Sequence, residues 1–174
     1  AAAERLSQSE DRFMRIFELM PYPVLMSRRA DGAYLMVNEA WERLTGIPRD
    51  QALGRTAVEL GLFSAEGRRQ LLDTMSGRTV HNALEITIHP RTGGDRTLLQ
   101  SLHAAELDGT PVWLVSAHDI TERKSTEALQ AAIYGISEAA HTEQTLESLF
   151  ERIHHIIGSL LPATHFSVAL YDAS

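Results

Sequence analysis

Residues 112–124 have the sequence VWLVSAHDITERK, in which an apolar segment passes directly into a polar one. The β-branched and aromatic residues at its start predict a strand. Asp119 and Thr121 follow, and their short side-chain oxygens can accept from the backbone N–H groups left unpaired where a helix begins. The stretch therefore predicts a strand that leads straight into a helix, an arrangement that can pass a displacement from a folded core to whatever the helix joins.

Composition limits the classes of function. A chain of 174 residues with 44% apolar residues can form one domain and part of another. No apolar run approaches the ~20 residues of a membrane span, and no signal-peptide pattern opens the sequence, so we expect a cytoplasmic location. The absence of cysteine excludes disulfides, thiolate metal sites and cysteine nucleophiles. A formal net charge of −7 with scattered basic residues argues against nucleic acid as a partner.

The first predicted element is a helix that ends at Pro21. Residues 7–10 have the spacing of a capping box. The apolar side chains that follow are three and four positions apart, as expected for one face of a helix: Phe13, Ile16, Phe17 and Met20.

A hairpin and several short helices are predicted next. Asp31-Gly32 is a strong turn signal between the strand-like residues 24–27 and 34–37. Asn38 suits the N-cap of the helix that carries Trp41, and Gly46 suits its end. Short helices are expected across residues 49–63. A further helix from Ser64 to Gly77 should bury Leu71, Leu72 and Met75.

Three longer strands complete the core, over residues 79–89, 97–105 and 110–118. Gly93-Gly94 and Asp108-Gly109 mark the turns between them. Two strands, a group of helices and three antiparallel strands make an α+β pattern.

Three strings, in this order, resemble the PAS domain, a small sensory module of bacterial signalling proteins. Residues 9–21 resemble the helix that precedes a PAS core, residues 37–46 resemble its first core helix, and residues 119–124 resemble its end. The resemblance implies a five-stranded antiparallel sheet with short helices on one face, flanked by N-terminal and C-terminal helices. On this basis residues 1–21 are the flanking helix and residues 22–124 the PAS core.

The C-terminal third predicts two helices and a strand. Residues 121–140 form one helix, and residues 143–161 form a second with Thr142 as its cap. A strand is predicted over residues 165–172. Together with residues 136–140, these elements resemble the opening of a GAF domain, another sensory module. We therefore expect a signalling helix at 125–141 and the start of an incomplete GAF-like domain at 142–174.

Alternation along the strands selects the residues that should line the PAS interior. On the strand over residues 79–89, one face carries the even-numbered positions, with His81 opposite. The family's strand order adds residues of the other two strands and of the helices. The candidate pocket residues are Trp41, Leu71, Met75, Asn82, Leu84, Ile86, Ile88, Leu98, Gln100, Leu102, Trp113, Val115 and Ala117. A small apolar ligand held by Asn82 or Gln100 is one expectation, and a filled core without a ligand is the alternative.

The best-known PAS cofactors can be tested at particular positions. Leu53-Gly54-Arg55 resembles the sequence before the reactive cysteine of blue-light LOV domains, and the cysteine position falls on Ala57. LOV-type flavin adduct chemistry is thereby excluded, and flavin bound without an adduct has no positive support. Haem-binding PAS domains typically use a histidine before the third strand. Residues 64–77 contain none, and His81 is expected on the opposite face, so we do not expect haem. The cofactor stays unknown.

No catalytic or metal constellation is found in the sequence. His154 and His155 are adjacent, unlike the spacing of a helical metal pair, and Gly93-Gly94 lies in a hairpin without the helix and lysine of a phosphate loop. We therefore expect this segment to be sensory rather than enzymatic.

The favoured function is signal input, with Asp119, Ile120 and Thr121 as the relay to the outgoing helix. A parallel homodimer is expected through a stripe at coiled-coil spacing, made of Leu129, Ala132, Ile133, Ile136 and Ala140. The alternative for this stripe is that it packs within one chain. A downstream output domain of the same protein is the expected partner. A sensor histidine kinase is favoured as the parent, with a diguanylate cyclase or a ligand-free PAS scaffold as alternatives.

Overall fold

The computed structural model describes residues 2–75, 77, 79–143 and 145–160, and it divides into two compact units. The first unit is Ala1–Thr121 and the second is Glu122–Ser174. The strand predicted over residues 165–172 lies outside the described residues.

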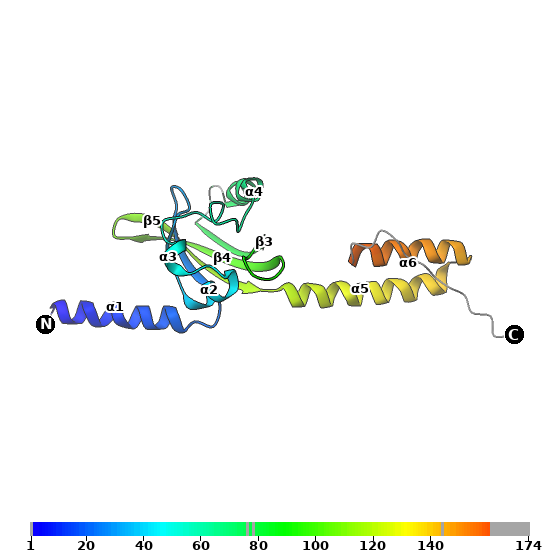
Figure 1. Cartoon of the computed structure of the whole chain (residues 1–174), viewed down its shortest axis with the longest axis horizontal. Coiled ribbons are helices and arrows are strands. Elements are labelled where there is room, and N and C mark those ends of the chain that lie inside the picture. The colour runs from blue at the N-terminus through cyan, green and yellow to red at the C-terminus, as the bar shows by residue number, and fades with distance from the viewer. Residues whose placement is uncertain (1, 76, 78, 144, 161–174) are drawn as a thin grey trace. The chain divides into compact units, whose positions relative to one another are not determined.

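The first unit is built on one antiparallel sheet with the order β2-β1-β5-β4-β3 (Figure 1). The strands are β1 (Val24–Arg28), β2 (Tyr34–Val37), β3 (Val80–Ile88), β4 (Arg96–Leu107) and β5 (Thr110–Asp119). The helices are α1 (Ala2–Leu19), α2 (Glu39–Thr45), α3 (Arg49–Ala52) and α4 (Ala65–Met75). Trp41, Ala52 and Met75 bring α2, α3 and α4 into the same buried cluster as the inner side chains of the sheet. The predicted α+β class and five-stranded sheet are confirmed.

Local signals in the sequence set several element ends. Asn38 accepts a hydrogen bond from the backbone N–H of Trp41 and caps α2, which ends at Gly46 with a φ of 67°. The Ser64 hydroxyl accepts from Gly67 N–H (3.0 Å) at the start of α4. These three predictions are confirmed. Gly46 is needed there because a residue with a Cβ is strained at positive φ.

The helices differ from expectation in two places. α1 begins at Ala2, so the capping-box residues 7–10 lie inside it. Phe17 is buried, but Phe13 and Ile16 of the predicted face remain exposed, because only the last turns of α1 contact the core. Leu72 is also exposed, since α4 meets the sheet only along the line of Leu71 and Met75.

A β-bulge changes the expected faces of β3. His81 pairs with Leu102 and Leu84 pairs with Gln100, so two residues of β3, Asn82 and Ala83, oppose one residue of β4. The backbone of Ala83 has a φ of 59°. Placing Asn82 inside and His81 outside was therefore wrong: His81 is buried on the covered face and Asn82 is exposed. Beyond the bulge, the predicted alternation of Leu84, Ile86 and Ile88 holds.

The second unit contains α5 (Thr121–Thr142) and α6 (Leu146–Leu160). The predicted cap at Thr142 is wrong, because its hydroxyl donates to the Glu138 carbonyl inside α5 (2.9 Å). Thr145 caps α6 instead, accepting from Ser148 N–H (3.2 Å). Arg152 of α6 pairs with Glu138 (3.5 Å) and Glu143 (3.3 Å), so the two helices are in contact.

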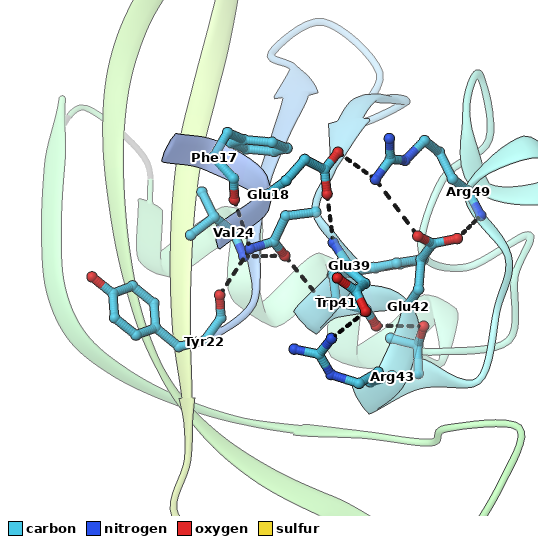
Figure 2. A network of polar contacts seen from close by, with 11 residues as sticks. Phe17, Glu18, Tyr22, Val24, Glu39, Trp41, Glu42, Arg43 and Arg49 are labelled. Atoms are coloured by element: carbon cyan, nitrogen blue, oxygen red, sulfur yellow. Dashed lines mark hydrogen bonds and ion pairs between the residues drawn. The ribbon is translucent and has the colours of Figure 1, made fainter. Parts of the chain in front are cut away.

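The buried amide of Asn38 joins four parts of the first unit, and Figure 2 labels its partners Phe17, Tyr22, Val24 and Trp41. Its Oδ1 accepts from the backbone N–H groups of Val24 and Trp41, both at 3.0 Å. Its Nδ2 donates to the carbonyls of Phe17 (3.2 Å) and Tyr22 (3.0 Å). The end of α1, the linker after it, the start of β1 and the start of α2 are thereby fixed to one side chain.

We expect Asn38→Ala to lower the free energy of unfolding by about 3 kcal/mol, because several buried backbone groups lose their partner. Urea unfolding followed by circular dichroism measures the change. Asn82→Ala is the matched control and should stay within about 0.5 kcal/mol, because its side chain is exposed. Equal effects of the two substitutions would contradict the role given to Asn38.

Candidate functional site

The inner face of the sheet carries two apolar clusters with Gln100 between them. One contains Leu102, Trp113 and Val115 from the sheet, and the other contains Ile86, Ile88, Leu98 and Ala117. Phe63 and Leu71 pack against both clusters. On β4 the inward-facing side chains are Leu98, Gln100 and Leu102, so the amide of Gln100 interrupts the apolar inner face of the sheet. All the candidate pocket residues except Asn82 are buried or half-buried in this interior.

Gln100 is a polar residue of this interior with hydrogen-bonding capacity open to a ligand. The residue is only 8% exposed, and its amide forms no hydrogen bond with another described residue. Its cross-strand neighbours are Leu84 on one side and Ala117 on the other, neither of which can pair with an amide through its side chain. Neither polar atom of the Gln100 amide is among the fully buried atoms that lack a partner, so the amide keeps some contact with solvent and can exchange it for a hydrogen bond to a bound molecule.

His81 is the interior residue that sequence reasoning missed. Its Nε2 lies 3.2 Å from the carbonyl oxygen of Met75. Because a carbonyl can only accept, this nitrogen carries the proton and donates. The ring packs edge-on against Trp113, with a centroid separation of 6.0 Å. The bulge that turns His81 inward has no glycine or proline to signal it, and simple alternation placed this side chain on the outside.

Aromatic rings also fill the part of the interior around Tyr34, Trp41 and Trp113. Tyr34 and Trp41 make an edge-to-face contact with centroids 5.3 Å apart. Burial raises the pKa of Tyr34 well above its usual range, so its hydroxyl stays protonated. The Arg29 guanidinium lies over the Trp113 ring, 4.7 Å from its centroid.

A cleft of about 430 Å³ opens between α4 and β3. Its apolar wall consists of Phe63, Leu71, Leu84 and Ile86, and its polar rim includes Ser64, Gln70, Thr74, Thr87 and His89. Leu84, which lines this cleft, is the cross-strand neighbour of Gln100. The cleft therefore lies beside the pair of strand positions that carries the amide.

The junction between β5 and α5 is held by hydrogen bonds at Asp119 and Thr121. The Asp119 carboxylate accepts from the backbone N–H (2.9 Å) and the hydroxyl (2.5 Å) of Thr121. The Thr121 hydroxyl oxygen accepts from Thr97 N–H of β4 (2.9 Å). Ile120 is buried, and its N–H donates to the Thr97 carbonyl (2.9 Å). The first residue of α5 is therefore tied to β4 as well as to the strand from which it leaves.

The residues at which the sequence was tested for known PAS cofactors can be located in the structure. Ala57, at the position of the LOV cysteine, is a buried core residue. His81, set aside as a haem ligand because of its expected outward orientation, faces inward. Among the described residues, no three His, Asp or Glu side chains group to hold a metal ion. None of the described helices is long and apolar enough to span a membrane.

Known proteins share this fold. The PAS domain of an HTR-like protein from Haloarcula marismortui matches with a TM-score of 0.58 and 26% identity, covering 68% of this chain and 98% of its own. The Rhodobacter sphaeroides LOV protein matches with a TM-score of 0.52 and 14% identity, covering 88% and 93%. The PAS domain of a Colwellia psychrerythraea protein matches with a TM-score of 0.55 and 14% identity, covering 64% and 97%. No curated protein matches the sequence significantly. Residues 11–120 match the family described as PAS fold, and the chain therefore belongs to the PAS family, whose domain is sensory and not catalytic.

Proposed function

We propose that this chain is the input and dimerisation module of a bacterial signal-transduction protein, acting in the cytoplasm. A change in the PAS interior would be passed through Asp119, Ile120 and Thr121 to α5. The observation that supports this route most directly is the double attachment of Thr121, to Asp119 and to Thr97. Because β4 also carries Gln100, a shift of this strand would move both the interior amide and the start of α5.

The proposed relay predicts that Asp119→Ala alters output without preventing folding. Loss of the carboxylate should cost about 1 kcal/mol of stability, the usual effect of losing a side chain that caps a helix start. In the parent protein, the ratio of stimulated to basal output should change. Glu106→Ala, at the exposed far end of β4, is the control and should respond as the unchanged protein does. A normal response of the Asp119→Ala protein would remove this residue from the relay.

The stimulus we propose is a small, largely apolar molecule bound in the interior near Gln100, reached through the cleft between α4 and β3. His81 replaces Asn82 as the second polar group of this site. The competing function is a ligand-free interaction scaffold, favoured by the aromatic rings that fill one end of the interior. The two functions predict opposite effects of removing the amide.

Gln100→Leu separates these two functions. With a ligand, native mass spectrometry of the purified protein should show a retained mass that Gln100→Leu loses and Asn82→Ala keeps. Without one, no retained mass is expected, and Gln100→Leu should raise the free energy of unfolding by about 1 kcal/mol, because a mostly buried polar side chain among apolar neighbours is replaced by an apolar one. A stabilised variant and an empty wild-type protein together would establish the scaffold.

Dimerisation through α5 is proposed on the exposure of its apolar stripe. Ile133 is 61% exposed and Leu129 54% exposed, whereas Ala132 of the same stripe is buried. We propose a parallel homodimer that covers the exposed members. The partner beyond it is an output domain of the same protein. A sensor histidine kinase is the favoured parent and a diguanylate cyclase the alternative, on family resemblance alone.

Ile133→Lys should convert the dimer to a monomer at micromolar concentration, because a lysine charge in the interface loses hydration without a partner. Sedimentation equilibrium measures the mass, and circular dichroism checks that the variant is folded. Gln130→Lys, on an exposed position of the same helix, is the control and should remain dimeric. A folded Ile133→Lys protein with the wild-type mass would contradict the interface.

A further inference from the structure

α5 carries two apolar stripes that point in different directions. Successive residues of an α-helix are about 100° apart, so one stripe contains the small residues Ala132, Gly135 and Ala139. The other contains larger side chains and lies about 100° around the helix: Leu129, Ile133, Ile136 and Ala140. A helix that contacts one partner needs one stripe, whereas a helix in a four-helix bundle contacts two neighbours and needs a wider apolar surface.

α6 covers only the small-residue stripe. Ala132 and Ala139 are buried, and Gly135 lies so close to α6 that a Cβ at this position would be 3.2 Å from Cδ1 of Ile156. The small side chains thus allow close packing of the two helices. The larger stripe, with Ile133 and Leu129 more than half exposed, is left uncovered by α6.

Like α5, α6 carries more apolar side chains than the contact between the two helices can bury. None of its residues is buried, although its sequence repeats apolar side chains at positions three and four apart. Leu149 and Ile156 lie on the side of the contact with α5. Leu146, Phe150 and Ile157 form a second stripe about 90° away, in which Leu146 is 58% exposed and Phe150 and Ile157 are half-buried.

The larger stripe of α5 and the second stripe of α6 lie on the same side of the helix pair. Arg152 reaches Glu138 and Glu143 along one edge of the contact. α6 runs antiparallel to α5. On each helix, the second stripe lies about 90° around from the line of contact, on the side away from Arg152 and Glu138, so both stripes belong to the same face of the pair. That face carries no charged side chain among the stripe residues, and it is two helices wide.

We propose that a second copy of the same helix pair covers this face and forms a four-helix bundle. This inference rests on the parallel dimer proposed above, which places the two-fold axis along the helices. The axis brings α5 of one copy against α6 of the second copy, so that every neighbouring pair in the bundle is antiparallel.

Rotation about the two-fold axis does not change the position of a residue along that axis. The contact between Gly135 and Ile156 therefore determines which residues of the two copies lie level with one another. Ile133 then faces Ile157 of the second copy, and Ala140 faces Phe150 of the second copy. A small side chain opposite a large one permits close packing at the second position. The face therefore complements itself, which is the requirement for a two-fold interface.

The size of the face suits a dimer. α6 is about 22 Å long at 1.5 Å per residue and two helix diameters are about 20 Å, giving a projected area of about 440 Å² per copy. The accessible surface of interdigitating side chains exceeds its projection, which brings the buried area toward the ~800 Å² per partner of stable complexes.

The absence of cysteine allows a direct test with the full 174-residue chain. Ile133→Cys and Ile157→Cys proteins are prepared separately, mixed, left to exchange subunits and oxidised mildly. The mixture should form a disulfide-linked heterodimer about tenfold faster than a control mixture, because a disulfide requires Cα atoms within ~7 Å. The control mixture contains Gln130→Cys and Ser159→Cys, which lie at a similar height on exposed positions away from the face. The proteins are first checked by sedimentation for wild-type mass.

Each outcome supports or overturns the bundle. Preferential linkage of Ile133→Cys to itself would overturn it and support a two-helix seam between the α5 helices, leaving the proposed dimer intact. A monomeric wild-type chain with no linkage would overturn both, and would indicate that residues 161–174 or another protein covers the face. Equal rates in the two mixtures would also overturn the bundle.

Discussion

Four hydrogen bonds to one buried amide determine how the first unit is assembled. Asn38 offers two acceptor sites to backbone N–H groups and two donors to backbone carbonyls, and all four are used. No apolar side chain could replace it, because the backbone groups at the end of α1 and the start of β1 would be buried without partners. The position of α1 against α2 is reinforced by Glu18, which pairs with Arg49 (2.5 Å) and accepts from Glu39 N–H (3.0 Å).

This junction is continuous with the strand that leads to α5. The linker after α1 contacts β5 directly: the Pro23 carbonyl accepts from Ala117 N–H (2.9 Å), and the Tyr22 ring lies 4.8 Å from the His118 ring. His118 is adjacent to Asp119, which binds the first residue of α5. The linker after the incoming helix and the first residue of the outgoing helix are thus both attached to β5. A displacement at either attachment has a short covalent and hydrogen-bonded route to the other.

The sequence was informative where a local interaction decides the structure. The Asn38 cap on Trp41, Gly46, Ser64 and the Asp31-Gly32 turn act within a few residues, so these roles follow from short motifs, whereas the bonds of Asn38 to Phe17, Tyr22 and Val24 join distant segments. The orientation of His81 depends on the pairing of β3 with β4, a relation between distant segments that alternation within one strand does not contain. The exposure of Ile16 has a similar origin, since periodicity identifies an apolar face but not how much of the helix reaches the core. In the candidate site, the inward orientation of Gln100 could therefore be predicted from the sequence, whereas that of His81 could not.

The bulge in β3 also affects how the sheet meets other molecules. β3 is the last strand of the sheet, so one of its edges is not paired with another strand of this sheet. An edge of this kind can extend by adding a strand from another chain, which is a route to aggregation. The irregular pairing between His81 and Leu84, with Ala83 in a left-handed conformation, breaks the regular spacing that an added strand would need. The residue insertion that orients a side chain in the interior thus also protects the edge of the sheet from uncontrolled association.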